Sequence, residues 1–216
     1  ILTYNCEYTT KIMNEFIINN YFRKIFVNII NKKIMYLFML KQKNKGMKIC
    51  IFPNDPLKTY YEKGEIKERY FNPKNIFKEI HVISLFDEEI DEEKVKMIAG
   101  NASFKIHTVG KVTLINKNKK KKEIIQLIKK INPDVIRSFN PLLQGWIAAK
   151  VKQELKIPLV ISLHGDYDRD NRYQTKKNHN YKKYFRLQLT KIILEKYSLS
   201  NADEVIIIYN FIRNYA

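Results

Sequence analysis

The sequence predicts an α/β protein with a doubly wound, mostly parallel sheet and helices on both faces. Two observations support this prediction: six short, β-branched apolar runs follow one another along the chain, and helical segments separate most of them. Strands that alternate with helices of this length form βαβ units, in which the strands are parallel. Right-handed crossovers then place helices on both faces of the sheet.

Six strands are expected from Met47 onward, each a short run rich in Ile, Val, Leu or Phe. Runs of this length and composition are typical of parallel strands that are buried on both faces. The expected strands are Lys48–Phe52, Glu79–Leu85, Phe104–Val109, Asp134–Phe139, Pro158–Leu163 and Ala202–Ile208. The segment Lys111–Ile115 is expected to continue the third strand or to pair with it.

Apolar residues at helical spacing predict the helices between these strands. Ile124, Ile128 and Ile131 recur on one face beneath a lysine-rich start. Pro141 suits the first turn of the helix that follows the fourth strand. The expected helices are Asp87–Glu93, Lys117–Ile131, Pro141–Leu155 and Tyr181–Leu199, whereas Asn54–Glu65 is expected to be a loop.

The chain has 216 residues and a formal net charge of +18. Two explanations stay open: a lysine-rich compositional bias, and a basic surface for anionic partners such as acidic lipid or phosphorylated substrates. The run Lys117–Lys122 is expected to be the solvated start of a helix. It lacks the interleaved aromatic residues of a nucleic-acid-binding patch, so nucleic acid is not an expected partner.

Several motifs of cofactor and metal sites are absent from the sequence. There is no Gly-x-Gly-x-x-Gly, no Gly-x-x-x-x-Gly-Lys and no Gly-x-Ser-x-Gly, which argues against a dinucleotide-binding fold, a P-loop and a hydrolase elbow. Cys6 and Cys50 form neither a metal pattern nor a disulfide framework, and the four histidines are scattered. We therefore expect no cofactor, no metal site and a reducing, cytoplasmic environment.

Residues 1–46 differ from the rest of the chain, because they are apolar and basic and precede Met47, where the first strand begins. No apolar run there is long enough to span a bilayer; the cleanest, Ile34–Leu40, is far too short. Three interpretations stay open: sequence outside the native domain, a basic amphipathic helix on a membrane surface, or a cover for an apolar face. The expected domains are thus residues 1–46 and 47–216.

The fifth strand ends at His164-Gly165-Asp166, the first group of candidate site residues. Ligands of open α/β sheets bind outside the carboxyl ends of the strands. Histidine is the side chain best suited to proton transfer near neutral pH. We therefore expect His164 to be catalytic, with Gly165 and Asp166 binding substrate.

Two further strand ends supply candidate binding residues. Asn54, Gly64 and Glu65 lie in the segment after the first strand, where Gly64 is free to adopt a positive φ. Asn140 follows the fourth strand and has two possible roles. It can hydrogen-bond substrate hydroxyls, or it can cap the helix that begins at Pro141.

Three stretches in a fixed order carry a resemblance to a known family. They are Pro133-Asp134-Val135-Ile136, Ile157-Pro158-Leu159-Val160-Ile161-Ser162-Leu163-His164-Gly165 and Ala202-Asp203-Glu204-Val205-Ile206-Ile207. From about Met47 to Ala216, the chain resembles the N-terminal half of retaining glycosyltransferases of the GT-B type, family four. One departure is that Asn54-Asp55-Pro56 stands where the family has a glycine pair.

The resemblance implies a Rossmann-like domain that forms one half of a GT-B fold and binds the acceptor. It implies hexosyl transfer from a nucleotide sugar to a glycan or a lipid-linked acceptor, without a divalent metal. His164 would line the cleft beside the donor sugar, and the segment Asn54–Glu65 would face acceptor or donor phosphate. The donor domain is missing from this chain, so we expect the fragment alone to be inactive.

Two other functions stay open at this point. One is a non-catalytic basic module that binds an anionic membrane or nucleic acid, for which the net charge of +18 is the reason. The other is a sugar-nucleotide epimerase with the same two-domain shape. The expected position is cytoplasmic, with attachment to the inner face of the membrane as a further possibility.

Overall fold

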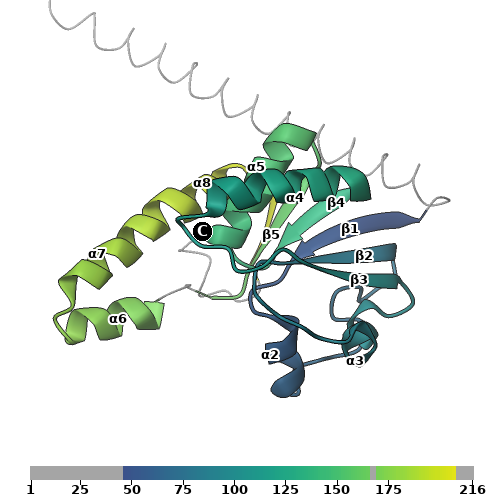
Figure 1. The fold of residues 1–216 in the computed structure, drawn as a ribbon, viewed down its shortest axis with the longest axis horizontal. Coiled ribbons are helices and arrows are strands. Elements are labelled where there is room, and N and C mark those ends of the chain that lie inside the picture. Colours follow the sequence, from purple (N-terminus) through teal and green to yellow (C-terminus); the bar gives the residue numbers. More distant parts are fainter. Residues whose placement is uncertain (1–45, 166–168, 208–216) are drawn as a thin grey trace, which may run out of the picture. The chain divides into compact units, whose positions relative to one another are not determined.

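The computed structural model describes residues 46–165 and 169–207. Its centre is a sheet of six parallel strands in the order β3-β2-β1-β4-β5-β6 (Figure 1). The predicted fold class, a doubly wound parallel sheet, is confirmed. The strands are β1 Met47–Phe52, β2 Phe77–Ser84, β3 Ser103–Thr108, β4 Val135–Ser138, β5 Leu159–Leu163 and β6 Glu204–Ile207.

The helices of the described residues lie between these strands. They are α2 Leu57–Glu62, α3 Glu92–Val95, the 3₁₀ helix η1 Lys96–Ala99, α4 Lys117–Ile131, α5 Leu143–Leu155, α6 Arg169–Lys177, α7 Tyr181–Thr190, the π-helix η2 Lys191–Glu195 and α8 Lys196–Ser200. The bounds of α4 are those expected from its apolar spacing. The helix expected over Tyr181–Leu199 is present as α7, η2 and α8 in succession.

Helix α2 corrects the prediction that Asn54–Glu65 is a loop. Leu57 is fully buried and anchors this short helix to the sheet. At its end, the Gly64 N–H donates to the Tyr61 carbonyl at 3.0 Å and the Glu65 N–H donates to the Tyr60 carbonyl at 2.8 Å. This is a Schellman ending, which requires the positive φ of +67° that Gly64 adopts.

The acidic segment Asp87–Glu93 was expected to be helical, and this was wrong for most of its length. The helix starts at Glu92, because Asp91 is its N-cap and accepts a hydrogen bond from the Glu93 N–H at 3.1 Å. Before it, Asp87 accepts from the Lys111 N–H at 2.9 Å. That bond draws Lys111 toward the segment after β2, so Lys111–Ile115 is not the strand that the sequence predicted.

Apolar side chains fill both faces of the sheet. On one face, Cys50, Ile136 and Ile161 pack against α4, α5 and η2. On the other, Ile49, Ile80 and Val82 pack against Leu57 of α2 and against η1. Figure 1 shows α4, α5 and α8 on one side of the strands and α2 and α3 on the other. Helices therefore cover both faces, as predicted.

Two aspartates fix the amino ends of neighbouring strands. Asp134 precedes β4, and its carboxylate accepts a hydrogen bond from the Lys48 N–H of β1 at 2.8 Å. Asp203 precedes β6, and its carboxylate accepts from the Leu159 N–H of β5 at 2.8 Å. Each aspartate thus satisfies a backbone donor at the edge opposite to the carboxyl ends.

Candidate functional site

The order of the strands reverses between β1 and β4, which is where ligands bind in doubly wound sheets. Phe52 and Ser138, the last residues of these two strands, lie side by side. Asn54 and Asn140 follow them, and Asn140 Nδ2 donates to Asn54 Oδ1 at 2.7 Å. Two residues predicted from separate strand ends therefore meet at this point.

The hydrogen bonds of Asn140 hold the turn before α5. Its Oδ1 accepts from the Leu142 N–H at 2.7 Å, and Leu142 is the N-cap position of α5. The prediction that Asn140 itself caps a helix beginning at Pro141 is therefore wrong by two residues, because Pro141 and Leu142 form a turn. Gln144 adds a bond from its Nε2 to the Asn54 carbonyl at 3.1 Å.

His164 lies at the end of β5, beside the ring of Phe139 at a centroid distance of 5.3 Å. The Arg137 guanidinium lies 4.4 Å from the centre of the same Phe139 ring. Burial lowers the pKa of His164, and the positive charge of Arg137 lowers it further. The imidazole is therefore neutral at pH 7, with one nitrogen that donates and one that accepts.

Arg137 is itself fixed in the sheet. Its Nε donates to Ser162 Oγ of the neighbouring strand at 3.0 Å. Burial lowers its pKa, but a guanidinium keeps its proton in proteins. The site therefore holds a permanent positive charge beside a neutral histidine, an arrangement that favours anionic groups.

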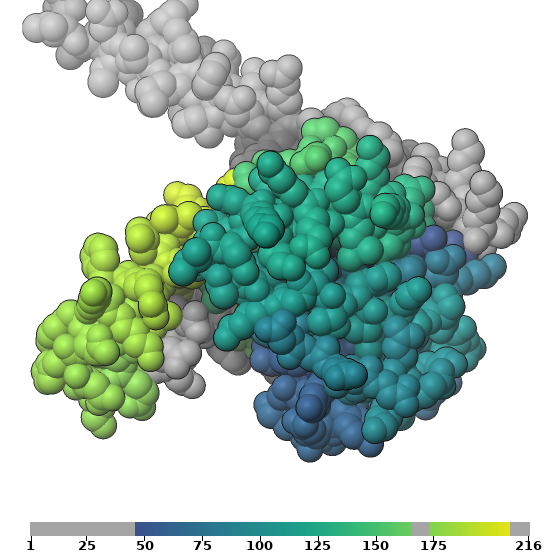
Figure 2. All heavy atoms as spheres, viewed as in Figure 1, coloured from purple at the N-terminus to yellow at the C-terminus, as the bar shows by residue number. Residues whose placement is uncertain are grey.

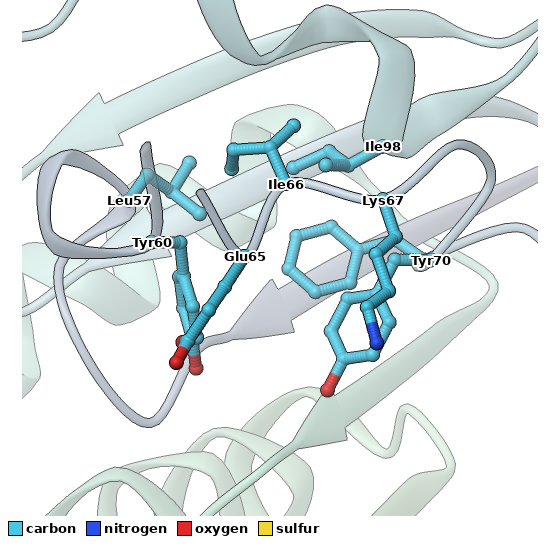
Figure 3. A pocket seen from close by; sticks show the side chains of 8 residues that line it. Leu57, Tyr60, Glu65, Ile66, Lys67, Tyr70 and Ile98 are labelled. Atoms are coloured by element: carbon cyan, nitrogen blue, oxygen red, sulfur yellow. The ribbon is translucent and has the colours of Figure 1, made fainter. Parts of the chain in front are cut away.

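A pocket of about 240 Å³ opens next to these residues. It is lined by Leu57, Tyr60, Glu65, Ile66, Lys67, Tyr70, Phe71 and Ile98, seven of which Figure 3 labels. Figure 3 shows the polar ends of Tyr60 and Glu65 pointing the same way. Burial raises the pKa of Tyr60, and the nearby Asp55 carboxylate raises it further, so this hydroxyl keeps its proton at neutral pH. The pocket thus combines apolar walls with two tyrosine hydroxyls, a carboxylate and an amine.

A series of aromatic rings joins this pocket to His164. Tyr70 contacts Phe139 at a centroid distance of 5.9 Å, and Phe139 contacts His164 at 5.3 Å. Phe71 supports both, at 5.4 Å from Tyr70 and 5.5 Å from Phe139. The pocket is therefore linked to the strand ends through packed rings, of which Phe71 and Phe139 are buried. We call the pocket residues together with Asn54, Asn140 and His164 the carboxyl-edge site.

The structure brings most of the predicted site residues to the carboxyl-edge site. Asn54, Asn140 and His164 lie at the strand ends, and a side chain at Gly165 would meet nothing within 4 Å. Glu65 lines the pocket, whereas the positive φ of Gly64 is accounted for by the end of α2. Asp166 lies outside the described residues. The binding and catalytic roles of these residues remain predictions.

The aromatic walls of the pocket were not predicted from the sequence. Tyr60 lay in the segment expected to be a loop, and Tyr70-Phe71 precedes Asn72-Pro73 in a stretch without a predicted element. An aromatic pair ahead of an Asn-Pro turn was a signal that could have been used. Gln144 was missed because it lies within a helix and reaches the site only through the fold.

The described residues contain neither a cluster of metal ligands nor a membrane-spanning helix. Within them, no group of three or more His, Cys, Asp or Glu side chains could hold a metal ion. Within 46–165 and 169–207, no helix is long and apolar enough to cross a bilayer.

The family of the chain follows from comparison with known proteins. A family model described as Glycosyltransferase Family 4 matches residues 78–216, which is more than half of the chain. The chain belongs to this family. The match includes β2 to β6, and with them Asn140 and His164 of the carboxyl-edge site.

Solved structures give weaker likenesses to this family 4 chain. The UDP-GlcNAc 2-epimerase of Methanocaldococcus jannaschii is 22% identical over 54% of this chain and 31% of its own, with a TM-score of 0.36. The UDP-GlcNAc 2-epimerase of Neisseria meningitidis is 11% identical over 74% and 46%, with a TM-score of 0.38. WaaB, a lipopolysaccharide outer core galactosyltransferase, is 14% identical over 54% and 32%, with a TM-score of 0.35.

The chain spans only about a third of the length of the Methanocaldococcus jannaschii epimerase and of WaaB. No curated protein matches the family 4 chain. Its fold assignment therefore rests on the order and direction of its own six strands.

Proposed function

We propose that the chain is the acceptor-side domain of a glycosyltransferase that transfers a hexosyl group from a nucleotide sugar to a glycan or lipid-linked acceptor. Membership of family 4 supports the class of reaction. The observation that carries the proposal is the convergence of Asn54, Asn140 and His164 with an aromatic pocket at one edge of the sheet. The donor nucleotide would bind mainly to a second domain, so the fragment alone would be inactive.

In this proposal the pocket receives the acceptor. The rings of Tyr60 and Tyr70 offer apolar surface to a sugar ring, and the Glu65 carboxylate accepts hydrogen bonds from its hydroxyls. The Asn54 and Asn140 amides are hydrogen-bonded to each other at the strand ends. An acceptor bound in the pocket would direct a hydroxyl toward His164, whose ring packs on Phe139 next to Tyr70.

Transfer forms a bond between the acceptor oxygen and the anomeric carbon, breaks the bond to the nucleoside diphosphate, and releases the acceptor proton. A neutral His164 can hydrogen-bond the reacting sugar as donor or acceptor. The fixed charge of Arg137 beside Phe139 favours the phosphate that becomes more negative as it leaves. His164 would orient the reacting sugar, and Arg137 would stabilise the leaving phosphate. The remaining contacts would come from the donor domain.

The test of His164 uses the full-length protein that contains this chain. We expect His164→Ala to lower the turnover of acceptor glycosylation by about tenfold or more, because a positioned polar group at the reacting centre is lost. His179→Ala is the matched control, since His179 is exposed and its ring contacts only Tyr181 among the described rings. An unchanged rate for His164→Ala would remove His164 from the site.

The class of reaction needs its own test. A glycosyltransferase releases nucleoside diphosphate from the nucleotide sugar only when an acceptor is present. Conversion of the nucleotide sugar to its epimer without acceptor would identify a sugar-nucleotide epimerase instead. Absence of both reactions in the full-length protein, together with binding to anionic membranes or nucleic acid, would support a non-catalytic module.

We also infer a cytoplasmic protein that is peripheral on the inner face of the membrane. The net charge of +18 supports this inference, since anionic lipid attracts basic proteins. A lipid-linked acceptor would place the enzyme at the same surface.

A further inference from the structure

Helix α7 and the π-helix η2 expose a stripe of large apolar side chains. Tyr181, Phe185, Leu189 and Ile192 recur at helical spacing and are 61%, 71%, 48% and 62% exposed, respectively. Side chains three or four positions apart lie on one face of a helix. By contrast, the apolar face of α4 is buried against the sheet. The stripe is thus an amphipathic face that the described part of the chain leaves uncovered.

Positive charge is concentrated in the part of the sequence that carries this stripe. From Tyr173 to Leu194 the sequence contains six Lys and Arg residues and no Asp or Glu. Lys182, Lys183 and Arg186 are exposed on α7 itself. We call the stripe and these three cations the α7 surface; α7 belongs to the light-green spheres of Figure 2.

We propose that the α7 surface docks the protein on an anionic lipid bilayer, an inference that rests on the peripheral membrane position proposed above. A helix with an apolar, aromatic-containing face and a Lys- and Arg-rich polar face lies in the membrane interface, with its apolar side chains among the acyl chains. Tyr and Phe suit the level of the head groups, where one end of the ring is wet and the other apolar. The cations of the α7 surface meet the negative charge of the lipid surface.

The chemistry of the stripe favours lipid over other occupants. Leu189 and Ile192 offer nothing to phosphates or bases, so nucleic acid would leave them exposed. In a two-fold dimer, the α7 surfaces of the two copies would face each other. The same cations would then lie close together across the contact, and like charges would repel. An anionic bilayer satisfies both the apolar and the charged parts of the surface.

The test measures binding of the full chain to vesicles of phosphatidylcholine with and without phosphatidylglycerol, by flotation. Residues 1–45 are themselves apolar and basic, so only differences between variants are decisive. One variant removes charge, Lys182→Gln with Lys183→Gln, and its control is Lys119→Gln with Lys122→Gln at exposed positions of α4. A second removes an apolar contact, Phe185→Ser, and its control is Met97→Ser, where Met97 is 50% exposed on η1.

We expect binding to need phosphatidylglycerol and to weaken as salt rises. The variant Lys182→Gln with Lys183→Gln should lower vesicle affinity by about tenfold or more, and its control variant should lose much less. Phe185→Ser should also weaken binding, while Met97→Ser leaves it unchanged. All four variants alter exposed side chains, so their circular dichroism should match that of the parent.

Other outcomes would overturn the proposal. Equal losses of vesicle affinity in the two double-lysine variants would mean that overall charge, rather than the α7 surface, attracts lipid. Self-association that Phe185→Ser abolishes would assign the stripe to a second copy. If the chain bound DNA but not vesicles, and the variant Lys182→Gln with Lys183→Gln lost that binding, the α7 surface would be assigned to nucleic acid. None of these readouts depends on transfer activity, so the outcome is separate from that for His164.

Discussion

At the scale of single residues, three histidines share a lowered pKa. Burial is the main cause for His81, His107 and His164 alike. His81 Nδ1 and His107 Nε2 lie 2.9 Å apart on β2 and β3, so one ring donates to the other when both are neutral. The charges of Lys48 and Lys105 near His81 oppose protonation, and Glu79 partly offsets them.

These lowered pKa values predict that the protein loses stability in mild acid. The unfolded histidines take up protons below about pH 6.5, while the folded ones resist until lower pH. The unfolded state therefore binds more protons, so the free energy of unfolding falls as the pH drops below this value. Denaturant titrations across this range should show the decline, and His107→Gln should make it shallower. Stability that rises in mild acid would contradict this explanation.

Asn140 gives a second prediction at this scale. Asn140→Ala removes the bonds to Asn54 Oδ1 and to the Leu142 N–H, two groups at a largely buried position. We expect a loss of about 1–3 kcal/mol in the free energy of unfolding, because buried polar groups lose their partners. Thermal or denaturant unfolding measures this loss. Asn178→Ala, at an exposed position after α6, is the control and should change stability by less than about 0.5 kcal/mol.

At the scale of elements, the start of α5 depends on a close approach at Gly145. A Cβ at this position would lie 2.7 Å from the Asn140 carbonyl oxygen and 3.1 Å from the Ser198 Cβ of α8. Alanine would therefore push α5 away from the turn that holds Asn140, despite its higher helix propensity.

We expect Gly145→Ala to lower the free energy of unfolding by about 1–3 kcal/mol, as overpacking does in other cores. Glu154→Ala, at an exposed position of the same helix, is the control for an alanine that does not contact the Asn140 turn. Urea unfolding of both variants gives the comparison. A Gly145→Ala variant as stable as the parent would show that the turn has room to move.

The elements also show what the sequence could and could not predict. The strands were predictable from their apolar runs, and α4 was predictable from its long series of apolar residues at helical spacing. Helix α2 was not, because it has only six residues and its main anchor is Leu57. The π-helix η2 was not predictable either, since the apolar spacing of Tyr181–Leu199 continues through it.

At the scale of the whole molecule, the two edges of the sheet carry different side-chain contacts. The amino edge is held by Asp134 and Asp203, which bond the backbone of the neighbouring strands. The carboxyl edge carries Asn54, Asn140 and His164. The strand ends of the site were predictable because parallel strands all deliver their carboxyl ends to one edge. The pocket was not predictable from the sequence, because Tyr70 contacts Phe139 only in the folded chain.

This division predicts that stability and binding can be separated. Asp134→Ala leaves the Lys48 N–H without its carboxylate partner, so we expect a loss of about 1–3 kcal/mol in the free energy of unfolding. Acceptor affinity should not change at a temperature where the variant is folded, because Asp134 lies at the opposite edge. Calorimetric titration with the acceptor and denaturant unfolding measure the two quantities, and a parallel loss in both would contradict the division.

The most direct test of the acceptor-side assignment is to map where an acceptor binds on the sheet. The isotopically labelled chain would be titrated with an oligosaccharide acceptor of the proposed glycosyltransferase, and amide chemical shifts would be followed by NMR. We predict shifts concentrated at the carboxyl edge, at Asn54, Tyr70, Asn140 and Gly165, with none at Asp134 or Asp203. Shifts at the amino edge, or no shifts at saturating oligosaccharide, would contradict the assignment.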